Sequence, residues 1–231
     1  IQYSILMNGL IHNIMNNHHE KIYLSIESLI TGDFAAGAVL ISFGALLGKV
    51  SLNQLLIISI LEIIFYSINE SIGVIHYQAV DMGGSMYVHT FGAYFGLAVS
   101  YAITDWEKLK NDKEKSTKVS DTFAMIGTIF LWLFWPSFNG ALAVGNSQHR
   151  VVINTVLSLT SSCMSAFAMS KFFRRKFNMV DIQNATLAGG VAVGSSADLV
   201  IGPSFSLLIG MIAGIMSTIG YNKIQPCLYD R

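Results

Sequence analysis

The stretch from Asp81 to Ser100, DMGGSMYVHTFGAYFGLAVS, places two ionisable side chains inside a run of mainly apolar residues. It is long enough to cross a bilayer, since about 20 helical residues span the hydrocarbon core. A carboxylate at Asp81 and an imidazole at His89 are costly in such a segment and are usually functional there. The segment is therefore predicted to be a transmembrane helix that carries the first candidates for a functional site.

Four glycines in the same stretch predict that this helix is buried among others. Gly83, Gly84, Gly92 and Gly96 carry no side chain, so the backbone can approach its neighbours closely. Gly92 and Gly96 also form a small-xxx-small pair, which favours helix contacts in lipid. We expect all four glycines to serve helix packing rather than chemistry.

The composition of the whole chain indicates an integral, multi-pass membrane protein. Hydrophobic residues make up 52% of it and charged residues only 12%, with a mean hydropathy of +0.53, which is too apolar for a soluble domain. Zero formal net charge without a basic stripe excludes nucleic acid as a partner. The two cysteines, Cys163 and Cys227, offer no CxxC site or disulfide framework. We expect neither a cofactor nor a metal.

Further apolar runs extend this pattern along the chain. Lipid offers no partner for backbone polar groups, so runs of this length without strict alternation are predicted to be helices. Complete spans are predicted near 25–48, 53–77, 80–103, 121–144, 150–172, 184–201 and 203–222, with a partial span before them. The fold class is an all-α, polytopic transmembrane helical bundle, and residues 1–231 form a single transmembrane domain. The GxxxG pairs Gly44 with Gly48, Gly190 with Gly194 and Gly210 with Gly214 are interpreted as close helix packing.

The basic residues orient this bundle. When successive loops alternate between two sides, only Lys21 and Arg150 of the 14 Lys and Arg residues fall on one of them. Loops rich in Lys and Arg stay in the cytoplasm, so the other side is predicted to be cytoplasmic. The longest loop, residues 104–120, mixes acids and bases and is interpreted as a charged, solvated cytoplasmic connector.

Several motifs resemble those of the Rh glycoprotein branch of the ammonium transporter superfamily. They are HTFGAYFGL at 89–97, WPSFN at 135–139, LGKVSLNQLL at 47–56, NSQHRVVINT at 146–155 and DIQNATLAGGVAVG at 181–194, and together they run over nearly the whole chain. The first two differ from the corresponding motifs of bacterial and plant ammonium transporters. The resemblance implies an Amt/Rh-like transporter fold, a homotrimer with one pore per subunit, and a location in the plasma membrane.

The resemblance also assigns roles to individual residues. His89 would line the pore, Phe34 and Phe138 would stack as an outer gate, and Glu70 would recruit cations in an outer vestibule. Aromatic faces attract cations, which suits such a gate. The alternative for His89 is a core histidine bonded to a backbone carbonyl, and the alternative for Glu70 is an ordinary solvated loop carboxylate. Asp81 would cap its helix, accept backbone donors, or favour a cation on its route.

Two features depart from the family pattern. The family pairs its pore histidine with a second one, from a helix that would follow residue 222. Because the chain also opens at Ile1, inside an apolar segment, we expect a domain that is incomplete at both ends. Glu62 stands where an uncharged residue is expected, and the sequence gives it no role.

The function implied is the passage of ammonium or ammonia, or of methylammonium, across a lipid bilayer. Ammonium would lose a proton at the phenylalanine gate, because a cation is far harder to dehydrate than a neutral amine, and neutral ammonia would pass His89. A carbon dioxide channel and a transport-silent membrane scaffold are the alternatives. An enzyme is not expected, because the chain contains no HExxH, no GxSxG and no close pair of intramembrane aspartates.

Overall fold

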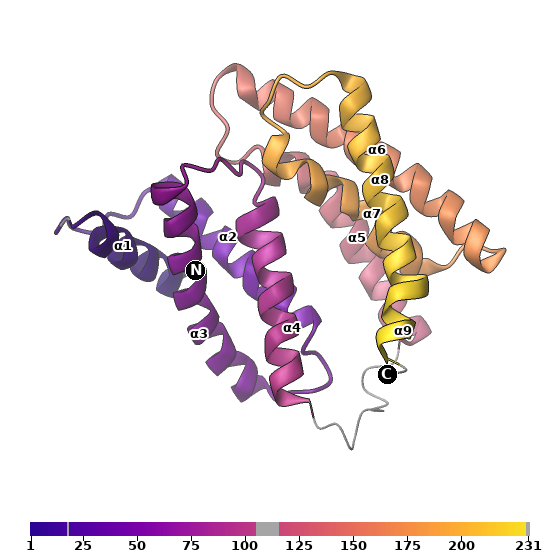
Figure 1. Cartoon of the computed structure of the whole chain (residues 1–231), viewed down its shortest axis with the longest axis horizontal. Helices are drawn as coiled ribbons and strands as arrows, with labels where there is room; N and C mark the ends of the chain where they lie inside the picture. Colours follow the sequence, from indigo (N-terminus) through magenta and orange to yellow (C-terminus); the bar gives the residue numbers. More distant parts are fainter. Residues whose placement is uncertain (18, 105–115, 230–231) are drawn as a thin grey trace. The chain divides into compact units, whose positions relative to one another are not determined.

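The computed structural model describes residues 1–17, 19–104 and 116–229, and within them every regular element is a helix (Figure 1). The chain divides into two compact units, Ile1–Lys115 and Ser116–Arg231. The predicted fold class, an all-α bundle of apolar helices, is confirmed. Most of the predicted connector at 104–120 lies outside the described residues, and its last residues, from Lys118, already belong to a helix.

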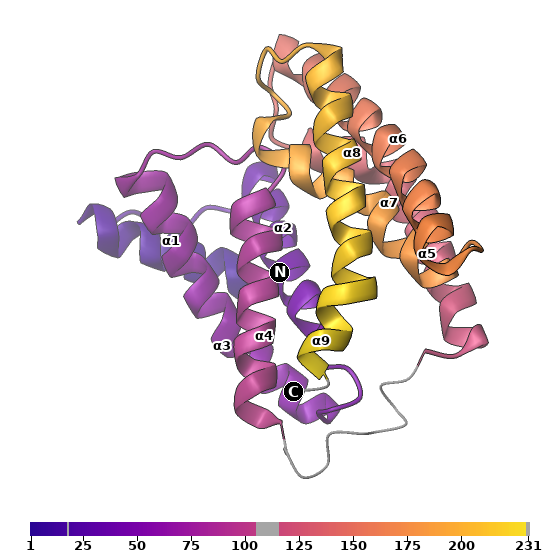
Figure 2. The same ribbon diagram turned by 45° about the vertical axis from the view of Figure 1, so that its right-hand side comes forward.

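The first unit is built around one central helix. Its elements are α1 (Gln2–Asn16), α2 (Ile26–Gly44), α3 (Leu52–Ser71), the π-helical turns η1 (Ile72–His76) and η2 (Ser85–Thr90), and α4 (Phe91–Ile103). η1 continues α3, and η2 runs directly into α4. Helix α2 contacts α1, α3, η2 and α4, and both views show it beside α4 (Figures 1 and 2).

Short polar motifs set where α2, α3 and, in the second unit, α5 (Lys118–Asn139) begin. Ser25 and Ser28 exchange side-chain and backbone hydrogen bonds at the start of α2, and Ser51 and Gln54 do the same at α3. Thr117 and Ser120 form the equivalent capping box at α5. Each box satisfies backbone N–H groups that the first helical turn leaves without partners.

The second unit packs three helices closely around α6. Its elements are α5 (Lys118–Asn139), α6 (Asn146–Arg174), α7 (Met179–Val193), η5 (Gly194–Ser196), α8 (Pro203–Ile219), η6 (Gly220–Ile224) and α9 (Gln225–Tyr229). Helix α6 contacts α5, α7 and α8, while α7 also contacts α5 and α8. Pro203 occupies the first turn of α8, where its missing N–H costs nothing.

Glycines on α7 and α8 meet serines on α6. A Cβ atom on Gly210 would overlap the Ser158 carbonyl, and one on Gly214 would lie 2.7 Å from the carbonyl oxygen of Ser162. A Cβ on Gly189 would also overlap the Ser158 carbonyl. The Gly210–Gly214 pair thus brings α8 against α6, as its spacing predicts.

Another predicted glycine pair does not pack helices. No described atom lies within 4 Å of a Cβ built on Gly44, and Gly48 adopts a φ of 83° in the turn after α2. A GxxxG spacing guarantees only that two glycines share one face of a helix. Whether another helix covers that face depends on the fold, and here Gly48 serves the turn instead.

The predicted span at 184–201 is also displaced, because α7 covers Met179–Val193. Beyond η5 the chain is held by α6: Asn154 Nδ2 donates to the Ala197 carbonyl over 2.9 Å, and Arg150 Nε donates to the Asp198 carbonyl over 2.8 Å. Pro203 disfavours helical backbone at the residue before it. Side chains from α6 therefore replace helical hydrogen bonds at this end of α7.

The helix count agrees with the predicted spans. Five helices of the described ranges are long and apolar enough to cross a membrane by themselves: Ile26–Gly44, Leu52–His76, Lys118–Asn139, Asn146–Arg174 and Pro203–Leu228. Helix α1, the continuous helix η2–α4, and α7 are the three shorter segments among the described residues. Together they correspond to the seven complete spans and one partial span that the sequence predicts, and the sidedness of the loops stays a prediction.

A buried carboxylate, Asp181 of α7, joins this helix to the end of α6 and to η6. Asp181 is fully buried, and its Oδ2 lies 2.9 Å from Arg174 Nε and 3.0 Å from Ser170 Oγ. Asn222 Nδ2 donates to Oδ1 over 3.0 Å. Asp181 is thus paired with a cation and hydrogen-bonded on both oxygens, as a buried charge requires.

Candidate functional site

Asp81 caps the helix that carries His89. Its Oδ1 accepts a hydrogen bond of 2.9 Å from the Ser85 N–H, and its Oδ2 accepts bonds of 2.7 and 2.9 Å from the N–H groups of Met86 and Tyr87. These are the N–H groups that the first turn of a helix leaves without a partner. The negative charge also lies at the positive end of the helix dipole. The contacts of Asp81 are thus those of a helix-capping carboxylate.

The turn before this helix requires glycine. Gly84 has a φ of 69°, in the left-handed region, and a Cβ on it would lie 2.6 Å from a methyl carbon of Val88. Gly83 is buried in the same turn. With glycine at 84, the chain can reverse tightly enough for Asp81 to reach three successive N–H groups.

His89 lies in η2, one turn beyond the cap, and is half-buried. Its backbone N–H donates to the Gly84 carbonyl over 3.0 Å. The neighbouring Val88 is almost fully buried, and its Cγ1 lies at ordinary contact distance from a Cβ built on Gly37 of α2. The position of His89 is thus fixed from two sides, by the capped turn and by α2.

Gly92 and Gly96 are the points where α4 meets α2. A Cβ on Gly92 would lie 2.6 Å from the Ala38 carbonyl oxygen, and one on Gly96 would lie 2.7 Å from Ser42 Cα. Both obstacles are backbone atoms, which cannot turn aside as a flexible side chain can. The two glycines therefore set the distance between α4 and α2 directly after His89.

Glu70 lies within α3 and not in a loop. It is half-buried, and it accepts hydrogen bonds from Asn8 Nδ2 over 3.1 Å and from Tyr66 Oη over 3.4 Å. Ser67 Oγ in turn donates to Asn8 Oδ1. The alternative of a solvated loop carboxylate is therefore wrong. The sequence did not identify Asn8 as a partner, because nothing in the local pattern links α1 to Glu70. Tyr66 was also missed, although it stands four residues before Glu70 on α3, a spacing that places two side chains on one helix face.

The two predicted gate residues occupy different units. Phe34 is buried in α2, with 6% of its surface exposed. Phe138 is half-buried near the end of α5, and its ring centroid lies 5.9 Å from that of Trp135. Because Phe34 and Phe138 belong to different units, the stacking of their rings stays a prediction.

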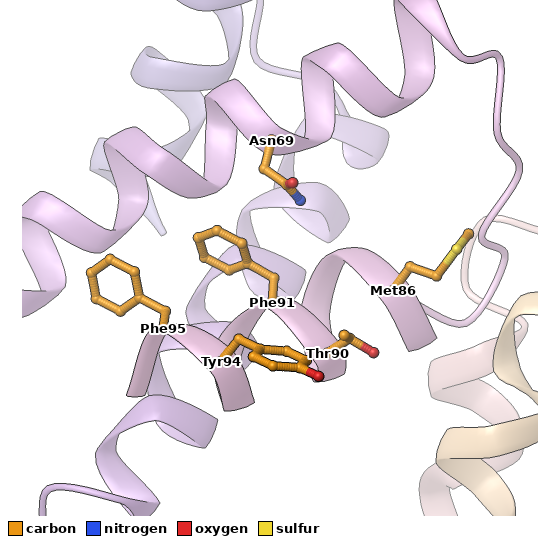
Figure 3. Close-up of a pocket in the computed structure, with 6 residues that line it drawn as sticks. All are labelled: Asn69, Met86, Thr90, Phe91, Tyr94 and Phe95. Carbon is orange, nitrogen blue, oxygen red and sulfur yellow. The ribbon is translucent and has the colours of Figure 1, made fainter. Parts of the chain in front are cut away.

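An apolar pocket of about 400 Å³ opens between α3 and the helix η2–α4 (Figure 3). Asn69 of α3 faces Phe91 and Phe95, whose rings stack with centroids 5.8 Å apart. The pocket is completed by Met86, Thr90 and Tyr94. Neither His89 nor Asp81 lines it, so this pocket is separate from the candidate pore residue. In the described part of the chain, no cluster of three His, Cys, Asp or Glu side chains is placed to hold a metal ion.

Sequence reasoning missed one buried polar contact beside this site. Glu62 of α3 and Ser42 of α2 are both fully buried. Ser42 Oγ lies 2.5 Å from Glu62 Oε1 and 2.8 Å from the carbonyl oxygen of Gly92 in α4. The sequence marks Glu62 as unusual, but Ser42 is one of several small residues of α2 and gives no signal of its own.

The chain is similar to known proteins along almost its whole length. The model of the Ammonium Transporter Family matches residues 4–229. Ammonium transporter Rh type C of Xenopus laevis is 46% identical over 236 residues, covering 100% of this chain and 49% of that protein. Rh type A of Canis lupus familiaris is 48% identical, covering 99% and 55%, and Rh type B of Mus musculus is 48% identical, covering 100% and 51%. The chain spans about half the length of the curated relatives it matches.

A solved structure shows the same fold. It is described as "Nitrosomonas europaea Rh50 and mechanism of conduction by Rhesus protein family of channels", and it matches with a TM-score of 0.85 and 34% sequence identity. The match covers 98% of this chain and 62% of that one. With the family match along almost its whole length and close identity to three Rh types, this chain belongs to the ammonium transporter family and to its Rh glycoprotein branch.

Proposed function

We propose that this protein conducts ammonium or ammonia across a membrane, with His89 lining the pore. The observation that carries the proposal is the placement of His89. It lies half-buried in an apolar bundle, on a helix whose start is capped by Asp81 and whose next turn packs on α2 through Gly92. The fixed backbone around it suits a residue that must meet a passing solute, and the matched relatives are transporters by name.

The physical chemistry of the solute supports a mechanism in which ammonia passes as a neutral molecule. Glu70, held by Asn8 and Tyr66, would attract the cation at the outer side. Phe34 and Phe138 would form the gate, where ammonium gives up its proton to water on the outer side because an apolar pore does not replace the water shell of a cation. Ammonia would then take up a proton from water inside. A neutral imidazole at His89 can donate or accept a hydrogen bond, so it would replace water for ammonia.

The wider arrangement is part of the same proposal. The protein would be a single multi-pass transporter domain in the plasma membrane, assembled as a homotrimer, with the connector at 104–120 on the cytoplasmic side. The excess of basic residues on that side supports the orientation. The names of the relatives indicate transport and not catalysis.

Uptake measurements test the proposal directly. The protein is expressed in oocytes, methylammonium uptake and internal pH are recorded, and His89→Ala and Phe34→Ala are compared with wild type. His19→Ala is the matched control, since His19 is an exposed histidine outside the helices. We expect saturable uptake with alkalinisation, altered in rate or selectivity by His89→Ala and unaffected by His19→Ala. Wild-type uptake no greater than that of uninjected oocytes would refute it.

A further inference from the structure

Ser42 is the point at which three helices of the first unit meet. Its hydroxyl on α2 reaches Glu62 Oε1 on α3 over 2.5 Å and the Gly92 carbonyl oxygen on α4 over 2.8 Å. Ser42 and Glu62 are fully buried, and Gly92 is buried as well. Both distances lie within the range of O–H···O hydrogen bonds, so both contacts need a hydrogen between the oxygens.

A serine hydroxyl has only one hydrogen to donate. The Gly92 carbonyl can only accept, and an ionised carboxylate can only accept. If Glu62 were ionised, Ser42 could donate its hydrogen to Glu62 Oε1 or to the Gly92 carbonyl oxygen, but not to both. The other oxygen would then face the Ser42 oxygen with no hydrogen between them. A single arrangement satisfies both contacts: Glu62 carries a proton on Oε1 and donates it to Ser42 Oγ, which donates its own hydrogen to the Gly92 carbonyl.

The surroundings of Glu62 offer no counter-charge. Its Oε2 is buried and has no hydrogen-bond partner among the described residues, and within that part of the chain no Lys, Arg or His pairs with it. The other ionisable residues of α3 are Tyr66 and Glu70, and those of the elements around it are Glu27 and Asp33 on α2, Tyr3 and His12 on α1, His76 on η1, Tyr87 and His89 on η2, and Tyr94 and Tyr101 on α4. None of these is hydrogen-bonded to the Glu62 carboxyl. Burying a charge without a counter-charge is costly, and a neutral, protonated carboxyl group at Glu62 avoids this cost.

We infer that Glu62 is a neutral, protonated carboxylic acid, and that its proton positions α4 against α2 through Ser42 and Gly92. Gly92 follows His89 by less than one turn of the helix, so the hydrogen-bond chain also fixes the helix that carries His89. Glu62 is thus a positioning residue for the pore. The protonation state stands on the hydrogen-bond geometry alone, whereas the effect on the pore rests on the proposed function.

Infrared spectroscopy of the purified protein in lipid tests the protonation state. A protonated carboxyl has a carbonyl stretching band that an ionised carboxylate lacks. We expect this band at neutral pH in wild type, its loss in Glu62→Gln, and a change in its frequency in Ser42→Ala. Ser158→Ala is the matched control, because Ser158 is equally buried and donates to the Gly189 carbonyl over 2.8 Å with no carboxyl behind it. The inference is overturned if wild type and Glu62→Gln show an identical band. It is also overturned if the band has the same frequency in Ser42→Ala as in wild type.

Methylammonium uptake tests the positioning role. Glutamine keeps the shape and can donate through Nε2, so Glu62→Gln should stay within about twofold of wild type. Methionine keeps the length of the side chain but cannot donate a hydrogen bond to Ser42. Glu62→Met should therefore lower uptake about tenfold, because losing one buried hydrogen bond shifts the population of correctly packed helices by about that factor. Equal losses in the two variants, or a Glu62→Gln protein that does not fold, contradict the inference. If wild type itself shows no uptake, the proposed function fails, while the infrared band still decides the state of Glu62.

Discussion

Replacing Gly96 by alanine tests how closely α4 and α2 must approach. Gly96 is buried in α4, and a Cβ built on it lies 2.7 Å from Ser42 Cα and 2.9 Å from the Ser42 carbonyl oxygen. Nonbonded carbon atoms prefer separations of about 3.5 to 4.0 Å, so the two helices would have to separate by about 1 Å. The obstacle is backbone, so no rotamer change can relieve the overlap.

The size of the effect follows from two opposing contributions. Overpacking a tight interface costs about 1 to 3 kcal/mol, while alanine in place of glycine favours a helix by up to about 1 kcal/mol. We expect Gly96→Ala to lower the free energy of unfolding by about 1 to 2 kcal/mol. At about 2 to 4 °C for each kcal/mol in a protein of 150–250 residues, the melting temperature should fall by roughly 2 to 8 °C.

Thermal unfolding of the purified protein in lipid nanodiscs, followed by tryptophan fluorescence, measures this loss. Gly127→Ala is the matched control, since Gly127 lies inside α5 and no described atom is within 4 Å of a Cβ built there. That variant gains helix propensity without the overlap, so its melting temperature should stay level or rise. The reasoning is refuted if Gly96→Ala melts at the same temperature as Gly127→Ala.

The same thermal unfolding measurements test two carboxylates, the helix-capping Asp81 and the buried Asp181. Asp81→Ala removes the acceptor of three N–H groups and should cost about 1 to 2 kcal/mol, while Asp81→Asn, whose amide oxygen still accepts, should lose less; equal stability of all three proteins would exclude a capping role. Arg174→Ala leaves Asp181 buried with only hydrogen-bond donors and should cost about 1 to 3 kcal/mol, because Arg174 is 38% exposed and water replaces part of its charge. Adding Asp181→Asn should recover part of that loss, and purely additive effects would contradict a direct interaction.

The features that the sequence predicted well depend on local physical requirements. Bilayer thickness fixes the length of a span, so the apolar runs located the helices without knowledge of their packing. A carboxylate placed before the first turn of a helix has N–H groups within reach whatever the rest of the fold does. The capping contacts of Asp81 were therefore among the alternatives that its position alone suggested.

The features that the sequence did not predict depend on contacts between distant segments. Gly44 and Gly48 have the same spacing as Gly210 and Gly214, yet Gly210 and Gly214 meet α6 whereas Gly44 meets no neighbouring helix among the described residues. Asn8 reaches Glu70 from α1, a separation of 62 residues along the chain. No local pattern encodes such a pairing, and without the fold the partner of a buried polar residue stays unknown.

The two units solve the problem of helix association in lipid in the same way, and the comparison explains why Glu62 is exceptional. Lipid tails are as apolar as leucine, so helices are held by close packing and by hydrogen bonds between them. In the second unit Ser158 and Ser162 donate to the carbonyls of Gly189 and Ala185 over 2.8 and 2.5 Å, next to glycines that admit the close approach. Ser42 makes the same bond to α4, but a carboxyl from a third helix stands behind its oxygen. A serine hydroxyl that bridges two other helices has one hydrogen for one of them, so the other helix must donate a hydrogen to the serine oxygen. A protonated Glu62 can supply that hydrogen, and an ionised one cannot.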